Sequence, residues 1–391
     1  MRTFSLLAVL WATFARLCVA QADVKEPAQK PPADVLVFTN GDRLTGKLTS
    51  ASGGNVVFHS DMAGDLTVPF SKVKELRSGT EFVALRAAKP GKYKPAASGT
   101  VTFTDGNVTL TKSETTGQGA TQTLADKDLG FLIDVPTYAK EVDRKPGFRT
   151  GWTGTATAGF TLVRSTESST TFSGQLHFVR QIPTVPYLPM NHRTTINVAE
   201  TYGTSTSPVI PPTVPYSPPV VVQTSIFHAD GERDQYFSPR LYALADTSFD
   251  HNFASGLQLQ QVYGAGVGWT ALQKPKQELD LKADVHYERQ QFLQTASTPP
   301  PMNTEIIGST FQENYRRNLP MKVVVTEWAN ILPAWNDFVA YSANAYLGVA
   351  LPLYKRLNIS LSATDNYINN PAQYYKTNTV QYVTGVTYAF K

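Results

Sequence analysis

The closing segment of the chain, Asn378 to Phe390, alternates between two kinds of side chain. Its even-numbered positions from Val380 to Phe390 are mostly bulky and apolar, whereas its odd-numbered positions from Thr379 to Ala389 are mostly small or polar. Successive side chains of a strand point to opposite faces, so this segment predicts a strand with one apolar and one polar face. A half-buried strand of a soluble sheet shows this alternation, and so does a strand of a transmembrane barrel.

Similar segments recur through the second part of the chain. In 277–292, for example, apolar residues from Leu279 to Tyr287 alternate with the polar series Asp280, Lys282, Asp284, His286 and Glu288. Glu200 and Glu327 interrupt the apolar face of their segments. An even number of strands is typical of bacterial outer-membrane barrels. We mark twelve segments at 151–164, 170–181, 193–204, 221–236, 239–250, 256–272, 277–292, 307–317, 321–332, 337–351, 356–368 and 378–390.

Loop length gives a second, independent indication of a barrel. Extracellular loops of such barrels are long and periplasmic turns are short. The irregular connections Ser205 to Val220, Thr295 to Ile306 and Asn369 to Thr377 follow the third, seventh and eleventh segments, so they fall at the same end. The Pro-rich connection Ile182 to His192 is the exception, because it is long and falls at the opposite end. This sorting favours a membrane barrel over a soluble sandwich.

Shorter β-type runs separated by turn residues fill the part of the chain before the barrel. The Asn40-Gly41 pair between two apolar runs is a strong hairpin signal. A weak repeat is also present, because the five residues from Gly54 to Phe58 are echoed by the five from Gly106 to Leu110. We predict one or two small β-modules over 34–135, similar to an SH3-like or Sm-like barrel, followed by a linker over 136–150.

The amino terminus has the form of a secretory signal peptide. Arg2 is followed by an apolar run from Phe4 to Phe14, and Cys18-Val19-Ala20 ends in the small residue expected at a cleavage site. We therefore predict a signal peptide over 1–20 and a Pro- and Lys-bearing spacer over 21–33. Cys18 is the single cysteine, so the mature chain has no thiol for a disulfide or a metal site.

Composition narrows the class of protein. Removal of Arg2 and Arg16 with the signal peptide leaves 33 basic against 31 acidic residues, a balance that does not suggest nucleic acid as a partner. Charged residues make up 17% of the chain and aromatic residues 11%. No apolar run after the signal approaches the roughly 18 residues of a membrane helix. The mature protein is therefore either a secreted β-protein or an outer-membrane barrel.

Residues 151–391 resemble a family of outer-membrane barrels known as domain-of-unknown-function family 481, some of whose members are described as salt-induced outer membrane proteins. The resemblance rests on the strand around Gly159 with the Ser165 to Ser169 turn, on the motif from Pro239 to Tyr242, on the glycine run from Gly264 to Trp269, and on the closing Val383 to Phe390. It implies a fold and a location, without catalytic residues.

Candidate chemistry is sparse. The chain has six histidines outside any recognisable motif, and His251 beside Asp250 is the best candidate for a catalytic pair at a rim. We predict no catalytic residue, no metal site and no cofactor. The stripe Asp280, Lys282, Asp284, His286 and Glu288 is expected to line the lumen, either as a solute path or as an ordinary wet interior. Tyr382, Val386, Tyr388 and Phe390 are expected to form the signal that barrel-insertion machinery reads.

These observations predict an all-β protein: a periplasmic β-module followed by an antiparallel barrel of about twelve strands in the outer membrane of a Gram-negative cell. We expect a scaffold or a narrow channel that is not an enzyme. Its expected partners are lipid, the insertion machinery and a cell-wall or periplasmic partner of the module, and no nucleic acid. Two alternatives are an outer-membrane hydrolase with a rim His and Asp, and a soluble glycan-binding protein. A serine at Gly385 or an arginine at Gln381 is expected to be tolerated.

Overall fold

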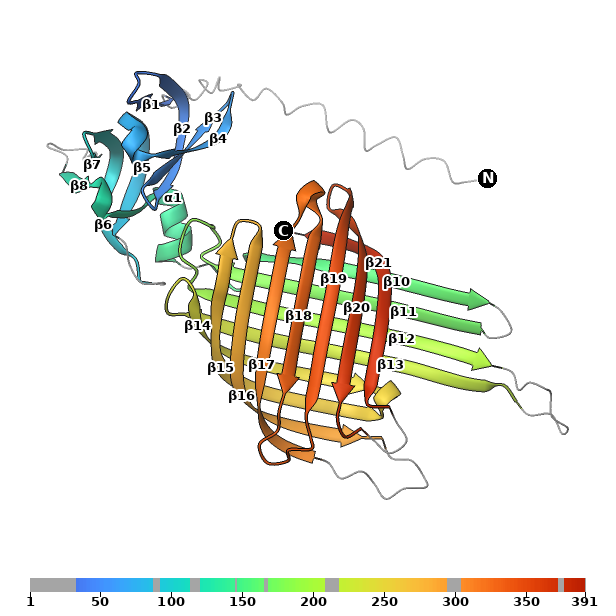
Figure 1. Ribbon diagram of the computed structural model, residues 1–391. Coiled ribbons are helices and arrows are strands. Elements are labelled where there is room, and N and C mark those ends of the chain that lie inside the picture. Colours follow the sequence, from blue (N-terminus) through green and yellow to red (C-terminus); the bar gives the residue numbers. More distant parts are fainter. Residues whose placement is uncertain are drawn as a thin grey trace, which may run out of the picture.

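The protein has two β-structures, a small module and a large barrel (Figure 1). The computed structural model describes residues 33–86, 92–112, 120–144, 146–164, 168–207, 218–293, 304–371 and 376–390. The expected signal peptide and all of the expected spacer except Ala33 lie outside these residues.

The module is a single nine-stranded antiparallel sheet that curls into a small barrel. Strands β1, β2, β9 and β5 close on one another, because β1 and β9 each pair with both β2 and β5. Strands β3 and β4 extend the sheet from β2, and β6, β7 and β8 extend it from β5. The strands are β1 (Asp34–Phe38), β2 (Arg43–Ser52), β3 (Asn55–Ser60), β4 (Gly64–Pro69), β5 (Val73–Arg86), β6 (Lys94–Thr104), β7 (Asn107–Thr111), β8 (Thr121–Ala125) and β9 (Leu129–Asp134).

The weak sequence repeat corresponds to a structural repeat. The series β2, β3, β4, the 3₁₀ turn η1 (Phe70–Lys72) and β5 is matched by β6, β7, β8, η2 (Asp126–Asp128) and β9. The same backbone hydrogen bond recurs in both halves, since Phe70 N donates to Gly54 O and Asp126 N donates to Gly106 O, each at 3.0 Å. Both halves contribute to one apolar core, which includes Phe58, Phe82, Phe103 and Leu110. The repeats therefore form one module.

Residues 152–390 form a closed antiparallel barrel of twelve strands, as the sequence predicts. Each strand pairs with the next, and β21 pairs with β10 to close the ring. The strands are β10 (Trp152–Arg164), β11 (Ser168–Ile182), β12 (His192–Ser207), β13 (Val220–Tyr236), β14 (Leu241–Asn252), β15 (Leu257–Lys274), β16 (Gln277–Phe292), β17 (Thr304–Asn318), β18 (Val324–Leu332), β19 (Ser342–Tyr354), β20 (Leu357–Ile368) and β21 (Asn378–Phe390).

The outer face of the barrel is apolar and exposed. Burying large apolar side chains is the usual outcome of folding in water, and a large exposed apolar surface marks contact with lipid or protein. On β21 the even-numbered side chains from Asn378 to Tyr388 are exposed, while Thr387 on the opposite face is buried. An exposed apolar wall around a polar lumen is the architecture of a transmembrane barrel. Outward side chains exposed by more than a third include Phe160, Phe172, Tyr202, Tyr263, Val267, Trp269, Val285, Phe311, Leu347, Leu361, Val380, Tyr382, Val386 and Tyr388.

The two ends of the barrel differ in their connections. We call the end at which β10 begins and β21 ends the module rim, and the opposite end the far rim. Turns at the module rim are short, at 237–240, 275–276, 319–323 and 355–356. Connections after β12, β16, β18 and β20 at the far rim are long, whereas β14 is followed only by the 3₁₀ turn η4 (Phe253–Ser255) and Gly256.

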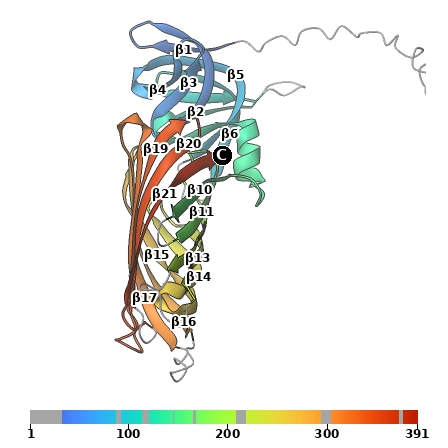
Figure 2. The same ribbon diagram turned by 90° about the vertical axis from the view of Figure 1, so that its right-hand side faces the viewer.

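The long connection 183–191 at the module rim docks the module. Its Leu188 is buried in an apolar cluster with Val83, Leu85 and Ile133 of the module, and the Tyr93 hydroxyl donates to Pro189 O at 2.7 Å. In Figures 1 and 2 the module and helix α1 (Val135–Tyr138) stand at this rim. The exceptional length of this connection is therefore explained by its role as an interface.

A buried carboxylate fixes the docking connection. Glu141, in the π-helical turn η3 (Ala139–Asp143), accepts hydrogen bonds from Thr184 N at 2.7 Å and from Thr184 Oγ1 at 2.6 Å. Its side chain is 1% exposed. Nearby, burial and the charges of Asp134 and Glu141 raise the pKa of Tyr187 to about 12, so that phenol is neutral at physiological pH. The segment expected to be a plain linker thus contains the polar centre of the interface.

The expectation that serine is tolerated at Gly385 is wrong. Gly385 faces the lumen, but β10 lies against it so closely that a Cβ atom there would be 2.6 Å from Ala158 O. A backbone carbonyl cannot move aside as a flexible side chain can. Gln381 has a side chain that faces the lumen, and it is therefore the appropriate polar-face control for the closing strand.

The two faces of β21 give a prediction for a matched pair of substitutions. Val386→Arg should destabilise the barrel folded in lipid by about 2–4 kcal/mol, because the charge would meet hydrocarbon. Gln381→Arg adds the same side chain on the lumen face and should cost much less. The folded fraction after refolding into vesicles can be measured from the shift in gel mobility on boiling. Equal folding of the two variants would contradict the orientation of the strand.

The docking carboxylate gives a second prediction. Glu141→Ala should destabilise the interface by about 2–3 kcal/mol, since a hydrogen bond to a charged group contributes about 1.5–3 kcal/mol. Lys140→Ala is the control, because Lys140 is 66% exposed and its Nζ lies 3.5 Å from the same carboxylate. Amide hydrogen exchange of 183–191, followed by mass spectrometry, should accelerate at least tenfold in Glu141→Ala alone. Unchanged exchange in that variant would show that the carboxylate does not hold the connection.

Candidate solute path in the barrel lumen

The lumen is lined by two chemically different walls. The walls formed by β10, β11 and β18–β21 present hydroxyl and amide groups such as Thr157, Asn344 and Ser360, without charge among the described side chains. The wall formed by β12–β17 presents many ionisable groups, of which most are acidic. Its acidic side chains are Asp230, Glu232, Asp234, Asp246, Asp250, Glu278, Asp280, Asp284 and Glu288, and its permanently basic ones are Arg193, Lys282 and Arg316.

Arg193 joins opposite parts of this wall near the module rim. Its Nε donates to Asp234 Oδ2 at 2.6 Å, and its Nη1 donates to Asp280 Oδ2 at 2.8 Å. The guanidinium also lies over the rings of Tyr236 and Tyr242, at 5.9 and 5.1 Å from their centroids. Asp234 and Tyr242 are completely buried. Because β12 and β16 are not neighbours in the barrel, the contact between Arg193 and Asp280 crosses the lumen near the module rim.

The stripe expected from the alternation of 277–292 lies on the lumen face of β16. Asp280 belongs to the Arg193 cluster, and Lys282 Nζ lies 2.6 Å from both carboxylate oxygens of Glu232. Asp284 accepts from Thr310 N at 3.0 Å and lies 3.1 Å from His286 Nδ1. Glu288 accepts from Gln290 Nε2 at 2.6 Å. The structure therefore divides the stripe among partners across the lumen on β12 and β13, on the adjacent β17, and on β16 itself.

His228 on β13 contacts two carboxylates of the acidic wall. Its Nδ1 lies 2.5 Å from Asp250 Oδ1 and its Nε2 lies 2.8 Å from Asp230 Oδ1. Asn197 Nδ2 donates to the same Asp230 carboxylate at 2.9 Å. The imidazole therefore links carboxylates on two neighbouring strands, β13 and β14.

The adjacent residues Asp250 and His251 lie on opposite faces of β14, so they do not share a site. Asp250 faces the lumen and contacts His228, whereas His251 faces outward and its Nε2 lies 2.8 Å from Ser225 Oγ. Ser225 Oγ also donates to Glu200 Oε1 at 3.0 Å. The outward Glu200 that interrupts the apolar pattern thus has a polar partner. Here the serine lies between the carboxylate and the imidazole, whereas a Ser-His-acid triad has the imidazole in the middle.

Sequence reasoning missed Arg193 and the acidic series on β13. Asp230, Glu232 and Asp234 alternate within 221–236, so the period of two could have identified them as one lumen stripe. Arg193 carries no such signal, because it is a lone charge at the start of its strand.

Neither a metal centre nor a membrane helix is found in the described parts of the chain. Across those residues, no group of three or more His, Cys, Asp or Glu side chains is arranged to hold a metal ion. Within the same residues, helices are too short and too polar to cross a membrane.

Comparisons with solved structures find β-barrel proteins of very low sequence identity. The KdgM porin in complex with disordered oligogalacturonate is 8% identical, with a TM-score of 0.30 over 61% of this chain and 99% of that chain. The translocator domain of the autotransporter NalP from Neisseria meningitidis is 10% identical, with a TM-score of 0.33 over 61% and 87%. The beta domain of the Bordetella autotransporter BrkA is 9% identical, with a TM-score of 0.29 over 61% and 98%.

Comparison with curated proteins gives no match. A family model, in contrast, matches residues 156–390, which is more than half of the chain and nearly the whole barrel. This match confirms the resemblance inferred from the sequence. The chain belongs to the family described as protein of unknown function, DUF481.

Proposed function

We propose that this protein is an outer-membrane barrel that provides a narrow passage preferring small cations over anions. The observation that carries the proposal is the excess of acidic side chains on the lumen face of β13, β14 and β16. A cleft lined by one sign of charge concentrates ions of the opposite sign, and rings of Asp and Glu select cations in other channels.

The Arg193 cluster makes the passage narrow. Its ion pairs and the two tyrosine rings lie across the lumen near the module rim. Removing one partner of a buried ion pair leaves an uncompensated charge, which is strongly destabilising. The cluster therefore supports the shape of the lumen as well as limiting its width, and a role as a scaffold is compatible with the same geometry.

Orientation follows from the two rims. Periplasmic turns are short and extracellular loops are long in outer-membrane barrels, so we propose that the module rim and the module lie in the periplasm. There the module is available to a cell-wall or periplasmic partner. The outward side chains of Tyr382, Val386, Tyr388 and Phe390 form the proposed signal for the insertion machinery.

We further propose that the protein is not a hydrolase. The Ser225 and His251 contact is the observation that would favour one, but the carboxylate of Glu200 contacts the serine and does not orient the imidazole. A soluble glycan-binding protein is disfavoured by the breadth of the exposed apolar wall.

Ion selectivity in a planar bilayer tests the passage. In a tenfold KCl gradient, the reversal potential should have the sign of a cation-preferring channel. The double variant Asp246→Asn, Glu278→Gln removes two lumen charges and should shift that potential towards zero by roughly a third. The control Glu305→Gln, Glu313→Gln removes two charges from the outer face and should leave it unchanged. Anion preference, equal shifts in both variants, or the absence of conductance would contradict the passage.

A further inference from the structure

The barrel is closed by an unusually short ladder. Strands β10 and β21 pair only through 154–158 and 386–390, and the last pair is Ala158 with Val386. Yet β10 continues to Arg164, and β21 begins at Asn378. The other eleven strand pairs of the barrel have longer registers, such as the thirteen residues from Trp152 to Arg164 that pair β10 with β11. The first and last strands therefore separate towards the far rim.

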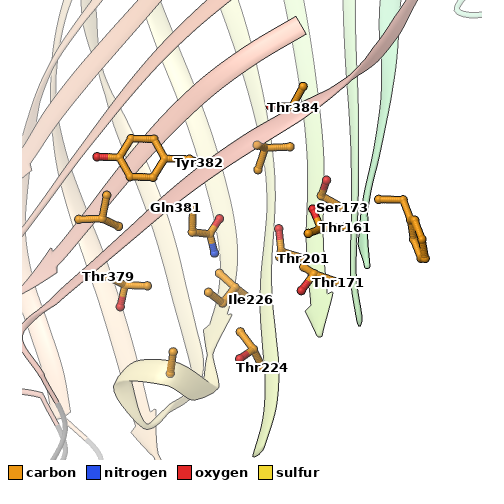
Figure 3. Close-up of a pocket in the computed structure, with 14 residues that line it drawn as sticks. Thr161, Thr171, Ser173, Thr201, Thr224, Ile226, Thr379, Gln381, Tyr382 and Thr384 are labelled. Atoms are coloured by element: carbon orange, nitrogen blue, oxygen red, sulfur yellow. The ribbon is translucent and has the colours of Figure 1, made fainter. Parts of the chain in front are cut away.

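The position of the separation is defined by a glycine. A Cβ atom on Gly159 would lie 2.8 Å from Thr384 O, so the two strands still touch one residue beyond the last pair. Figure 3 shows β21 diverging from β10 and its neighbours beyond this point. Phe160 and Tyr382 stand on the outside at the two edges of the opening, with 64% and 83% of their surfaces exposed.

A cavity of about 340 Å³ lies behind this opening. That volume is at the lower end of the range of about 300–1,000 Å³ for small-molecule sites. Gln381 of β21 points towards Ile226 of β13 across it, while Tyr382 points away (Figure 3). The lining residues with hydroxyl or amide groups that face the cavity are Thr161, Thr171, Ser173, Thr201, Thr224, Thr379 and Gln381.

The cavity shares the uncharged character of the wall formed by β10, β11 and β18–β21, and in this it differs from the acidic wall. None of its lining residues is acidic or basic, although the acidic wall occupies the neighbouring β13 and β14 closer to the module rim. Its mouth is bordered by apolar groups, including Phe160, Val380 and Val383. A ligand that fits both parts must carry neutral hydrogen-bonding groups at one end and be apolar at the other.

We propose that the seam between β10 and β21 binds an uncharged amphiphile that comes sideways from the bilayer. A neutral headgroup such as a sugar would lie among the hydroxyls of the cavity, and an alkyl chain would leave between Phe160 and Tyr382. In lipid, backbone N–H and C=O groups without a partner are costly, and a hydroxylated headgroup can satisfy those at the open edges. This proposal rests on the membrane location proposed above, and it is independent of ion passage.

Photo-crosslinking tests the site. The protein, first shown to be folded in phosphatidylcholine nanodiscs by its heat-modified gel mobility, is illuminated with a decyl glucoside that carries a diazirine in its chain. Label should saturate, should be displaced by unlabelled decyl glucoside, and should map to peptides from β10, β11 and β21. Label spread evenly over all strands, or displaced only by an extended peptide, would overturn the proposal. Failure to enter nanodiscs would instead contradict the membrane location.

Disulfides provide matched variants. Thr161→Cys with Val383→Cys joins two positions that would pair if the ladder continued for three more residues. A disulfide there would hold the opening shut, so oxidation should reduce labelling at least tenfold. Reduction of the disulfide should restore the labelling. Thr157→Cys with Thr387→Cys is the control, because these hydroxyls already lie 2.7 Å apart, and oxidation should change nothing. Unchanged labelling after the first disulfide forms would refute the site.

If the disulfide between Thr161→Cys and Val383→Cys does not form, a charge placed in the cavity tests the same binding site. Thr201→Glu should weaken labelling at least tenfold, since the site excludes charge. Ser360→Glu, which adds the same charge to the lumen face outside the cavity, should not. Equal labelling of the two variants would refute the site.

Discussion

The constraint on which this structure depends is that backbone polar groups cannot be left without partners in lipid. A helix meets the constraint within itself, whereas strands meet it only by closing into a ring. The twelve-stranded ladder does so, and the exposed apolar wall follows because every second side chain must then face the surroundings. The short ladder between β10 and β21 is the place where this constraint is met least well, because fewer backbone groups are paired there than between any other two neighbouring strands of the barrel.

Among the described side chains, charge in the lumen is confined to the wall formed by β12–β17, where part of it is paired. Arg193, Asp234 and Asp280 are buried together, and Lys282 is matched by Glu232. Such groups are stable in a low-dielectric interior only when each has its partner. The remaining acidic excess faces the lumen, and the neutral wall opposite it carries hydroxyls and amides. This division separates the proposed ion path from the uncharged cavity at the seam.

Much of the barrel could be predicted from the sequence, because a period of two determines which side chains share a face. The register of β16, from Asp280 to Glu288, and the two faces of β21 follow from it directly. The contacts that cross the barrel cannot be predicted from this period. Arg193 and Asp280 are 87 residues apart, and Glu141 meets Thr184 across the junction of two structures. The need for glycine at position 385 could not be predicted either. A backbone carbonyl of the adjacent strand lies against Gly385, and the alternation of apolar and polar residues does not reveal that contact.

The central claim is that this wall separates lipid from a polar lumen, and fluorescence quenching at two adjacent positions tests it most directly. In a chain that begins after Ala20 and so lacks Cys18, Leu361→Cys and Ser360→Cys are each labelled with bimane and refolded into vesicles. Leu361 is outward and 46% exposed, so its label should be quenched by doxyl lipids and protected from iodide. The label at Ser360, on the lumen face, should not be quenched by doxyl lipids. Equal quenching of both labels by iodide, with no effect of doxyl lipids on either, would contradict the account.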